Sequence, residues 1–173
     1  MIRIIGAAAG VAMFTAGSAS AACSTDKDAY DLTSDEAQAS YACLEAEMHA
    51  GYVKGPKRWI DAGVVEGYRG WRLASTAPAA PGFHSERFLV TWVNGVGYDA
   101  YTEFKDEGAK MPAGTIIAKE SFQVSEAGAA SAGPLFFMEK AAAGASPQTD
   151  DWYYYMVSAG GAPQGVDEVR VSR

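Results

Sequence analysis

The chain has 173 residues, an aromatic content of 12% and a formal net charge of −7 at pH 7. A chain of this length is expected to fold as a single domain with a hydrophobic core. The chain has 21 acidic and 14 basic residues, and the acidic residues are not gathered in a separate stretch. Such an evenly acidic surface repels phosphate backbones and argues against nucleic acid as a partner.

The first 22 residues have the pattern of a cleaved export signal. Arg3 precedes an uncharged, mostly apolar stretch from Ile4 to Ala16, and Ala19-Ser20-Ala21 offers small residues to a signal peptidase. The apolar stretch is shorter than the roughly 20 residues that span a bilayer, so we expect no membrane span. Cleavage leaves a domain of residues 23–173, periplasmic or secreted. Lipidation of Cys23 is the alternative, although Ser20 stands where that signal has a large aliphatic residue.

A capping box marks the start of the first predicted helix. Thr33 and Glu36 have the spacing at which each side chain bonds the other's backbone N–H. The helix is predicted from Ser34 to about Ala50, with its end at Gly51. Its apolar stripe consists of Ala37, Tyr41, Leu44 and Met48.

The chain contains two cysteines, Cys23 and Cys43. An oxidising compartment makes a disulfide between them the expected state, with two free thiols as the alternative. Cys43 lies well off the apolar stripe of the first helix. An N-terminal arm that carries Cys23 can therefore reach it.

The rest of the chain predicts an α+β fold. N-terminal helices precede a mainly antiparallel sheet of four to five strands with one inserted helix. The expected helices are Lys57–Tyr68 and Gly97–Glu107. The expected strands are Trp71–Ala74, Arg87–Val93, Thr115–Val124, Leu135–Glu139 and Trp152–Val157, and Gly165–Val171 is a candidate to pair back. The small-residue segments Gly128–Gly133 and Ala141–Ser146 are expected to be loops.

Few residues suggest chemistry. Glu45 and His49 share a helix face, but a zinc site needs three or four ligands. In a strand, Trp152, Tyr154 and Met156 share one face. That face is interpreted either as core or as the wall of a pocket for a flat ligand.

The second half of the chain resembles a known family. The matching segments are Tyr68–Trp71, Arg87–Asn94, Pro112–Glu120 and Asp151–Tyr155. Together they resemble the cytochrome P-460 family and the β-sheet cytochromes c′, over about residues 67–165. The resemblance implies a periplasmic protein with a c-type haem, which acts in electron transfer or on small nitrogen compounds such as hydroxylamine and nitric oxide.

Two departures qualify what the resemblance implies. The chain contains no Cys-x-x-Cys-His, the family's haem attachment motif, and Asp99 stands where hydroxylamine-oxidising members have a haem-linked lysine. Trp92, Asp99, Phe104 and Trp152 are the expected haem-pocket residues, and His49, His84 or a methionine would supply the axial ligand. The leading hypothesis is a cytochrome P-460-like protein with impaired haem attachment and a small redox or gas ligand. The alternative is a haem-free binding or structural module on the same scaffold.

Overall fold

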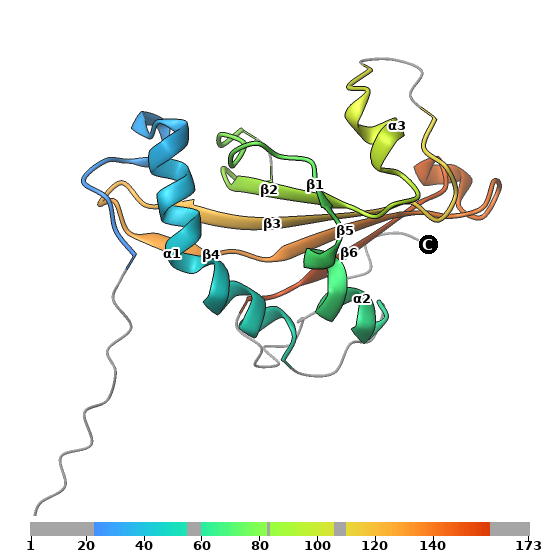
Figure 1. Cartoon of the computed structure of the whole chain (residues 1–173), viewed down its shortest axis with the longest axis horizontal. Coiled ribbons are helices and arrows are strands. Elements are labelled where there is room, and N and C mark those ends of the chain that lie inside the picture. Colours follow the sequence, from blue (N-terminus) through green and yellow to red (C-terminus); the bar gives the residue numbers. More distant parts are fainter. Residues whose placement is uncertain (1–22, 55–59, 83, 106–109, 160–173) are drawn as a thin grey trace, which may run out of the picture.

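The structure is a computed structural model that describes residues 23–54, 60–82, 84–105 and 110–159. These residues form one antiparallel sheet with three α-helices (Figure 1). The strand order is β1-β2-β3-β5-β6, and β4 pairs with the C-terminal end of β3. The strands are β1 (Arg72–Leu73), β2 (Phe88–Val93), β3 (Ile116–Val124), β4 (Ala130–Ala132), β5 (Leu135–Lys140) and β6 (Trp152–Val157).

The predicted α+β class and antiparallel sheet are confirmed, but the predicted number of strands is wrong. The described residues contain six strands, because Gly128–Gly133 is not simply a loop. Within it, β4 pairs with β3 in the register Phe122↔Ala132, and the Gly133 N–H donates to the Ser121 carbonyl at 2.8 Å. The alanine- and serine-rich sequence of β4 lacks the β-branched and aromatic residues typical of a strand. This segment becomes a strand because it lies beside β3 and pairs with it. The predicted segments 1–22 and Gly165–Val171 lie outside the described residues.

Helix α1 (Ser34–Tyr52) begins as predicted. The Thr33 hydroxyl accepts the Glu36 N–H at 3.3 Å, and the Glu36 carboxylate accepts the Thr33 N–H at 2.8 Å. Lys27 adds an ion pair to Glu36 at 2.6 Å. The predicted end at Gly51 is wrong, because this glycine lies within the last turn of the helix.

Gly51 has a packing role instead of a terminating one. A Cβ atom at this position would lie 2.0 Å from the carbonyl oxygen of Ala159, just after β6. Only a residue without a side chain therefore allows α1 to approach the backbone beyond the last strand this closely.

The predicted disulfide between Cys23 and Cys43 is confirmed, with Cα atoms 5.9 Å apart. The arm that carries Cys23 also joins the sheet. The Cys23 carbonyl accepts the Ala130 N–H at 2.8 Å, and the Thr25 N–H donates to the Gly128 carbonyl at 2.9 Å. The disulfide therefore ties α1 to the β3–β4 hairpin through this arm.

The two shorter helices differ from their predicted bounds. Helix α2 covers Ala62–Gly67, because the Asp61 carboxylate caps it by accepting the Gly63 N–H at 2.8 Å. A 3₁₀ turn, η2 (Tyr68–Gly70), follows, and residues 57–59 of the predicted helix lie outside the description. Helix α3 covers only Tyr98–Thr102, and the left-handed backbone of Phe104 (φ 48°) prevents its continuation.

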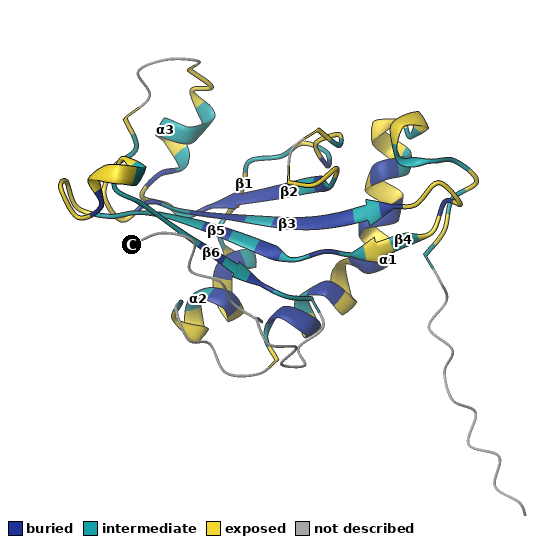
Figure 2. Cartoon of the chain, turned by 180° about the vertical axis from the view of Figure 1, so that it is seen from behind, coloured by how far each residue is buried: buried dark blue, intermediate teal, exposed yellow. Residues whose placement is uncertain are grey.

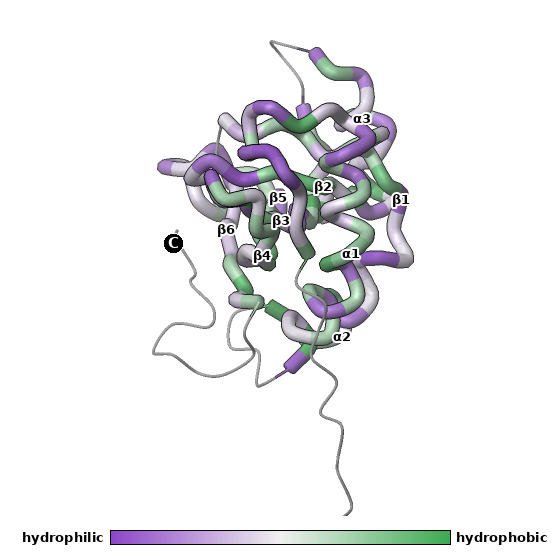
Figure 3. The backbone as a smooth tube through the Cα atoms, turned by 90° about the vertical axis from the view of Figure 1, so that its left-hand side faces the viewer, coloured by the Kyte–Doolittle hydropathy of each residue, from purple (hydrophilic) through white to green (hydrophobic). Residues whose placement is uncertain are grey.

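The sheet has two unlike faces. Figures 1 and 3 show α2 and α3 on opposite sides of it. The inner face packs against α1, α2 and η2 and forms the main core, which includes Val90, Phe122 and Phe137. The outer face is covered beside β2, where α3 lies and the Tyr101 hydroxyl is close to Thr91. Its β5 and β6 positions are only partly buried (Figure 2).

No helix in the described part of the chain has the length and apolar character needed to cross a bilayer.

Gly51→Ala tests the close approach of α1 to Ala159. Alanine normally stabilises a helix interior by up to about 1 kcal/mol over glycine. Here we expect a net loss of stability, because overpacking costs about 1–3 kcal/mol, and the melting temperature should fall. Gly67→Ala is the matched control, since Gly67 has open space around it and should gain stability. A Gly51→Ala variant as stable as Gly67→Ala would contradict the packing role.

Candidate functional site

A buried carboxylate lies under α1, on the inner face of the sheet. Glu120 of β3 is fully buried. One of its oxygens accepts the Tyr41 hydroxyl at 2.8 Å, and the other accepts the Tyr68 hydroxyl and the Arg69 Nε, the latter at 2.7 Å. Burial, and then the charge of Glu120, raise the pKa of both tyrosines far above the ordinary value.

This network is structural. Every oxygen of Glu120 has a partner, and the carboxylate is closed off from solvent. Arg69 also donates to the Glu45 carbonyl at 2.7 Å and lies 5.9 Å from the centre of the Trp92 ring. The network therefore joins α1 and η2 to β3 and leaves no group open to a ligand.

The outer face of the sheet carries a different set of side chains. The strand register places Lys119 of β3 beside Phe136 of β5, and Phe136 beside Met156 of β6. In the next row, Met138 lies beside Tyr154. Cross-strand neighbours of this kind lie about 5 Å apart, so they form one continuous, largely apolar surface.

A cavity of about 270 Å³ lies on this surface. Its walls come from the outer-face side chains of β3, β5 and β6 and from His84 in the loop before β2. Tyr154 and Met156 were predicted to share a face, and the structure confirms this. It also supports the interpretation of that face as a pocket wall, because these side chains are only partly buried.

His84 closes one side of the cavity. Its ring lies 4.7 Å from the ring of Phe136. Three consecutive non-glycine residues, His84, Ser85 and Glu86, have left-handed backbones (φ 54°, 60° and 58°), an uncommon conformation. The Ser85 carbonyl accepts Gln123 Nε2 at 3.0 Å, which anchors this loop to the sheet. Burial, and then the charge of Lys119, lower the pKa of His84 below 6.5, so the ring is neutral at pH 7.

Lys119 is the cationic group of the cavity. Burial lowers its pKa below 10.5. Within the part of the chain that the structure describes, no hydrogen bond or ion pair engages its ammonium. The apolar cavity is therefore lined by one lysine whose ammonium has no counter-charge among the described residues.

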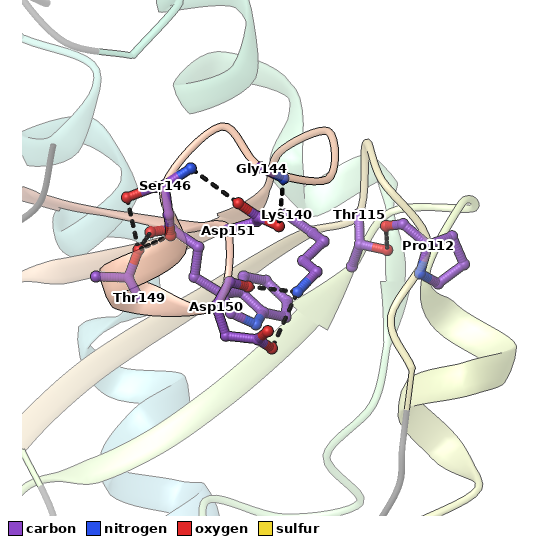
Figure 4. A network of polar contacts seen from close by, with 9 residues as sticks. Pro112, Thr115, Lys140, Gly144, Ser146, Thr149, Asp150 and Asp151 are labelled. Carbon is purple, nitrogen blue, oxygen red and sulfur yellow. Dashed lines mark hydrogen bonds and ion pairs between the residues drawn. The ribbon is translucent and has the colours of Figure 1, made fainter.

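A second cavity, of about 350 Å³, lies near the end of the same face, beside Trp152. The charged groups of its 140–151 wall satisfy one another, as Figure 4 shows. The Asp151 carboxylate accepts the backbone N–H groups of Gly144 and Ser146 at 2.9 and 2.8 Å, and Lys140 pairs with Asp150 at 3.2 Å. These contacts hold the 141–151 loop, and of the charged side chains in the described lining only the exposed Lys110 is left unmatched. The wall of the first cavity is more apolar and aromatic, so we take the first cavity as the candidate site.

The structure does not bring the four expected haem-pocket residues together. Trp92 lies on the inner face, 8% exposed, with its ring 5.6 Å from that of Tyr68. Trp152 lies on the outer face, 5.3 Å from the Lys140 ammonium. Asp99 and Phe104 are exposed, with Asp99 paired to Arg72 at 2.9 Å. Among the described residues these four therefore line no common cavity, and with the two tryptophans on opposite faces of the sheet they do not fit one haem.

The two histidines occupy different sites. His49 faces the inner side, where its ring lies 5.8 Å from Tyr68 and its Nε2 is buried. Among the described residues no three His, Cys, Asp or Glu side chains gather as a metal site. His84 alone lies against the candidate cavity.

No family model matches the chain, and no curated protein matches it either. The site therefore has to be interpreted from its own chemistry.

Sequence reasoning missed Lys119 and Phe136 as site residues, and it named His84 only as a possible axial ligand of haem. A signal for the first was present, because Lys119 and Glu120 are adjacent charges within an otherwise uncharged predicted strand. Alternation places one of them on each face. The others depend on the pairing of β5 and on the loop before β2, which no local pattern indicates.

Glu120→Gln tests the inner network. The substitution removes the negative charge that pairs with Arg69. The NH₂ group of the new amide is a hydrogen-bond donor, and it would face the donors that now bind the carboxylate. We expect a loss of about 3–5 kcal/mol in the free energy of unfolding, typical of breaking a buried ion pair, measured by urea denaturation. Glu126→Gln, at an exposed position, is the control and should change stability by less than about 0.5 kcal/mol. Equal losses in the two variants would contradict the role of the network.

Proposed function

We propose that this protein is a binding module for a small apolar ligand, which it holds in the cavity between β3, β5, β6 and His84. The observation that carries the proposal is the cavity itself. It lies on an exposed sheet face, with walls of aromatic and methionine side chains. Ligand sites are typically concave and mostly apolar with a few polar groups, and this cavity matches that description.

The shape of the wall favours a flat or slender ligand. Phe136, Met138, Tyr154 and Met156 are side by side in the sheet, so they present a low surface instead of a deep shaft. Methionine side chains adapt to irregular partners, and aromatic rings offer flat contact. A hydrocarbon chain or a ring system laid along β5 and β6 would bury apolar area on both partners.

Haem is the second candidate ligand, and one observation favours it. His84, Met138 and Met156 line the same cavity, and imidazole and thioether groups are axial ligands of haem iron. In this hypothesis a cytochrome P-460-like scaffold holds haem without covalent attachment, with His84 as the ligand. The neutral state of His84 at pH 7 suits that role.

We also infer that the protein is exported. The pattern of residues 1–22 supports this, and so does the Cys23–Cys43 disulfide, a bond typical of oxidising compartments. Expression of the full chain in a Gram-negative bacterium should yield a periplasmic protein whose intact mass begins at Ala22 or Cys23. A protein that keeps Met1 and stays in the cytoplasm would contradict export. A heavier, membrane-bound form with a lipid on the Cys23 sulfur would contradict the disulfide, because one sulfur cannot carry both bonds.

The binding function predicts that a neutral, apolar fluorophore such as N-phenylnaphthylamine brightens on titration into the protein. Met138→Trp fills the cavity and should abolish the signal, whereas Leu73→Trp, at an exposed position on β1, should leave it unchanged. A parallel titration with hemin tests the second candidate, because an absorption shift that His84→Ala removes would favour haem. No saturable signal with either probe, or an equal effect of both tryptophan variants, would contradict the proposed site.

A further inference from the structure

We propose that the natural ligand is an apolar monocarboxylic acid, whose carboxylate binds the Lys119 ammonium while its hydrocarbon body lies on Phe136, Met138, Tyr154 and Met156. This inference rests on the proposed function and names its ligand class. It is carried by one lysine among the residues that line an otherwise apolar cavity.

The acidic groups near Lys119 in the fold are already engaged. The adjacent Glu120 points to the other face, where Tyr41, Tyr68 and Arg69 hold it. Glu86, in the loop that carries His84, accepts the Tyr30 hydroxyl. Glu139 of β5 accepts the Tyr155 hydroxyl at 2.8 Å. Lys119 is therefore left without a counter-charge from the described residues.

The burial of Lys119 strengthens its interaction with any anion that reaches it. Its cross-strand neighbours are Thr91 and Phe136, so most of its side chain is covered. A charge that has lost water without gaining a partner is held at a cost, which its lowered pKa reflects. An anion that enters the cavity removes that cost, and the resulting charge-assisted hydrogen bond lies in a medium of low polarity.

The single lysine also selects the type of anion. One positive charge balances one carboxylate, and His84 adds no second charge at pH 7. A phosphate ester carries more than one negative charge near neutral pH and would need further cations, which the cavity lacks among its described lining residues. A carboxylate with an apolar body therefore suits this site best. Aliphatic and aromatic acids share this chemistry.

The test is a set of titrations with matched ligands on the full-length exported protein. Decanoate is compared with decanol, and naphthoate with naphthalene methanol, each by displacement of N-phenylnaphthylamine and by calorimetry. We expect each acid to bind about tenfold more tightly than its alcohol, as for a charge-assisted hydrogen bond. The stronger of the two acids then separates an aliphatic from an aromatic ligand.

Variants assign the preference to Lys119. Lys119→Met keeps the length and apolar contacts of the side chain, so it should bind the fluorophore normally but lose the preference for acids. Lys119→Arg should keep it. Lys140→Met is the control, because Lys140 lies on the same face and is paired to Asp150. Thermal melts confirm that each variant is folded.

The outcomes separate this inference from the proposed function. Equal binding of acid and alcohol, with normal fluorophore binding, would overturn the role of Lys119 and leave the apolar pocket in place. A preference for acids that survives in Lys119→Met would also overturn it. If neither the fluorophore nor decanoate binds by calorimetry, both the pocket and the inference fail.

Discussion

The buried carboxylate of Glu120 is the interaction on which the arrangement of the elements depends. It receives hydrogen bonds from Tyr41 of α1, from Tyr68 of η2 and from Arg69. Two segments far apart in sequence, α1 and η2, thus meet at one point of β3. Apolar packing alone tolerates small displacements of a helix on a sheet, whereas a charge without water needs all its partners in place. This requirement fixes how α1 and η2 sit on the inner face.

The inner network also determines which face of the sheet remains available. The two helices nearest the N-terminus and η2 cover most of the inner face, and α3 covers only the part of the outer face that lies beside β2. The row of β5 and β6 side chains opposite the helices is therefore left partly open. A ligand can bind on this open part of the outer face through side-chain contacts, because the backbone groups of β5 and β6 are already hydrogen-bonded to each other.

Local signals predicted the parts of this fold that depend on neighbours in sequence. The Thr33–Glu36 box fixed the start of α1 because its hydrogen bonds close within four residues. The strand Trp152–Val157 follows from its run of aromatic residues, and its bounds agree with the structure. The position of Cys43 off the apolar stripe likewise indicated the disulfide.

What could not be predicted depends on contacts between distant segments. Gly51 has the usual sign of a helix end, but Ala159, more than a hundred residues later, decides its role. The pairing of β4 comes from its neighbour and not from its composition. The cavity requires the register of β3, β5 and β6 together with the loop of His84. Sequence reasoning identified only Tyr154 and Met156 as wall residues and His84 as a possible haem ligand.

The adjacency of Lys119 and Glu120 has a consequence for how β3 finds its place. Successive residues of a strand point to opposite faces, so a slip of one position exchanges the two sides. It would bring an ammonium toward Arg69 and leave a carboxylate among methionines and rings. Both misplacements are costly, whereas the native alignment satisfies the acid at once. The opposite charges of these two neighbours therefore disfavour a one-residue register shift of β3 while the sheet assembles.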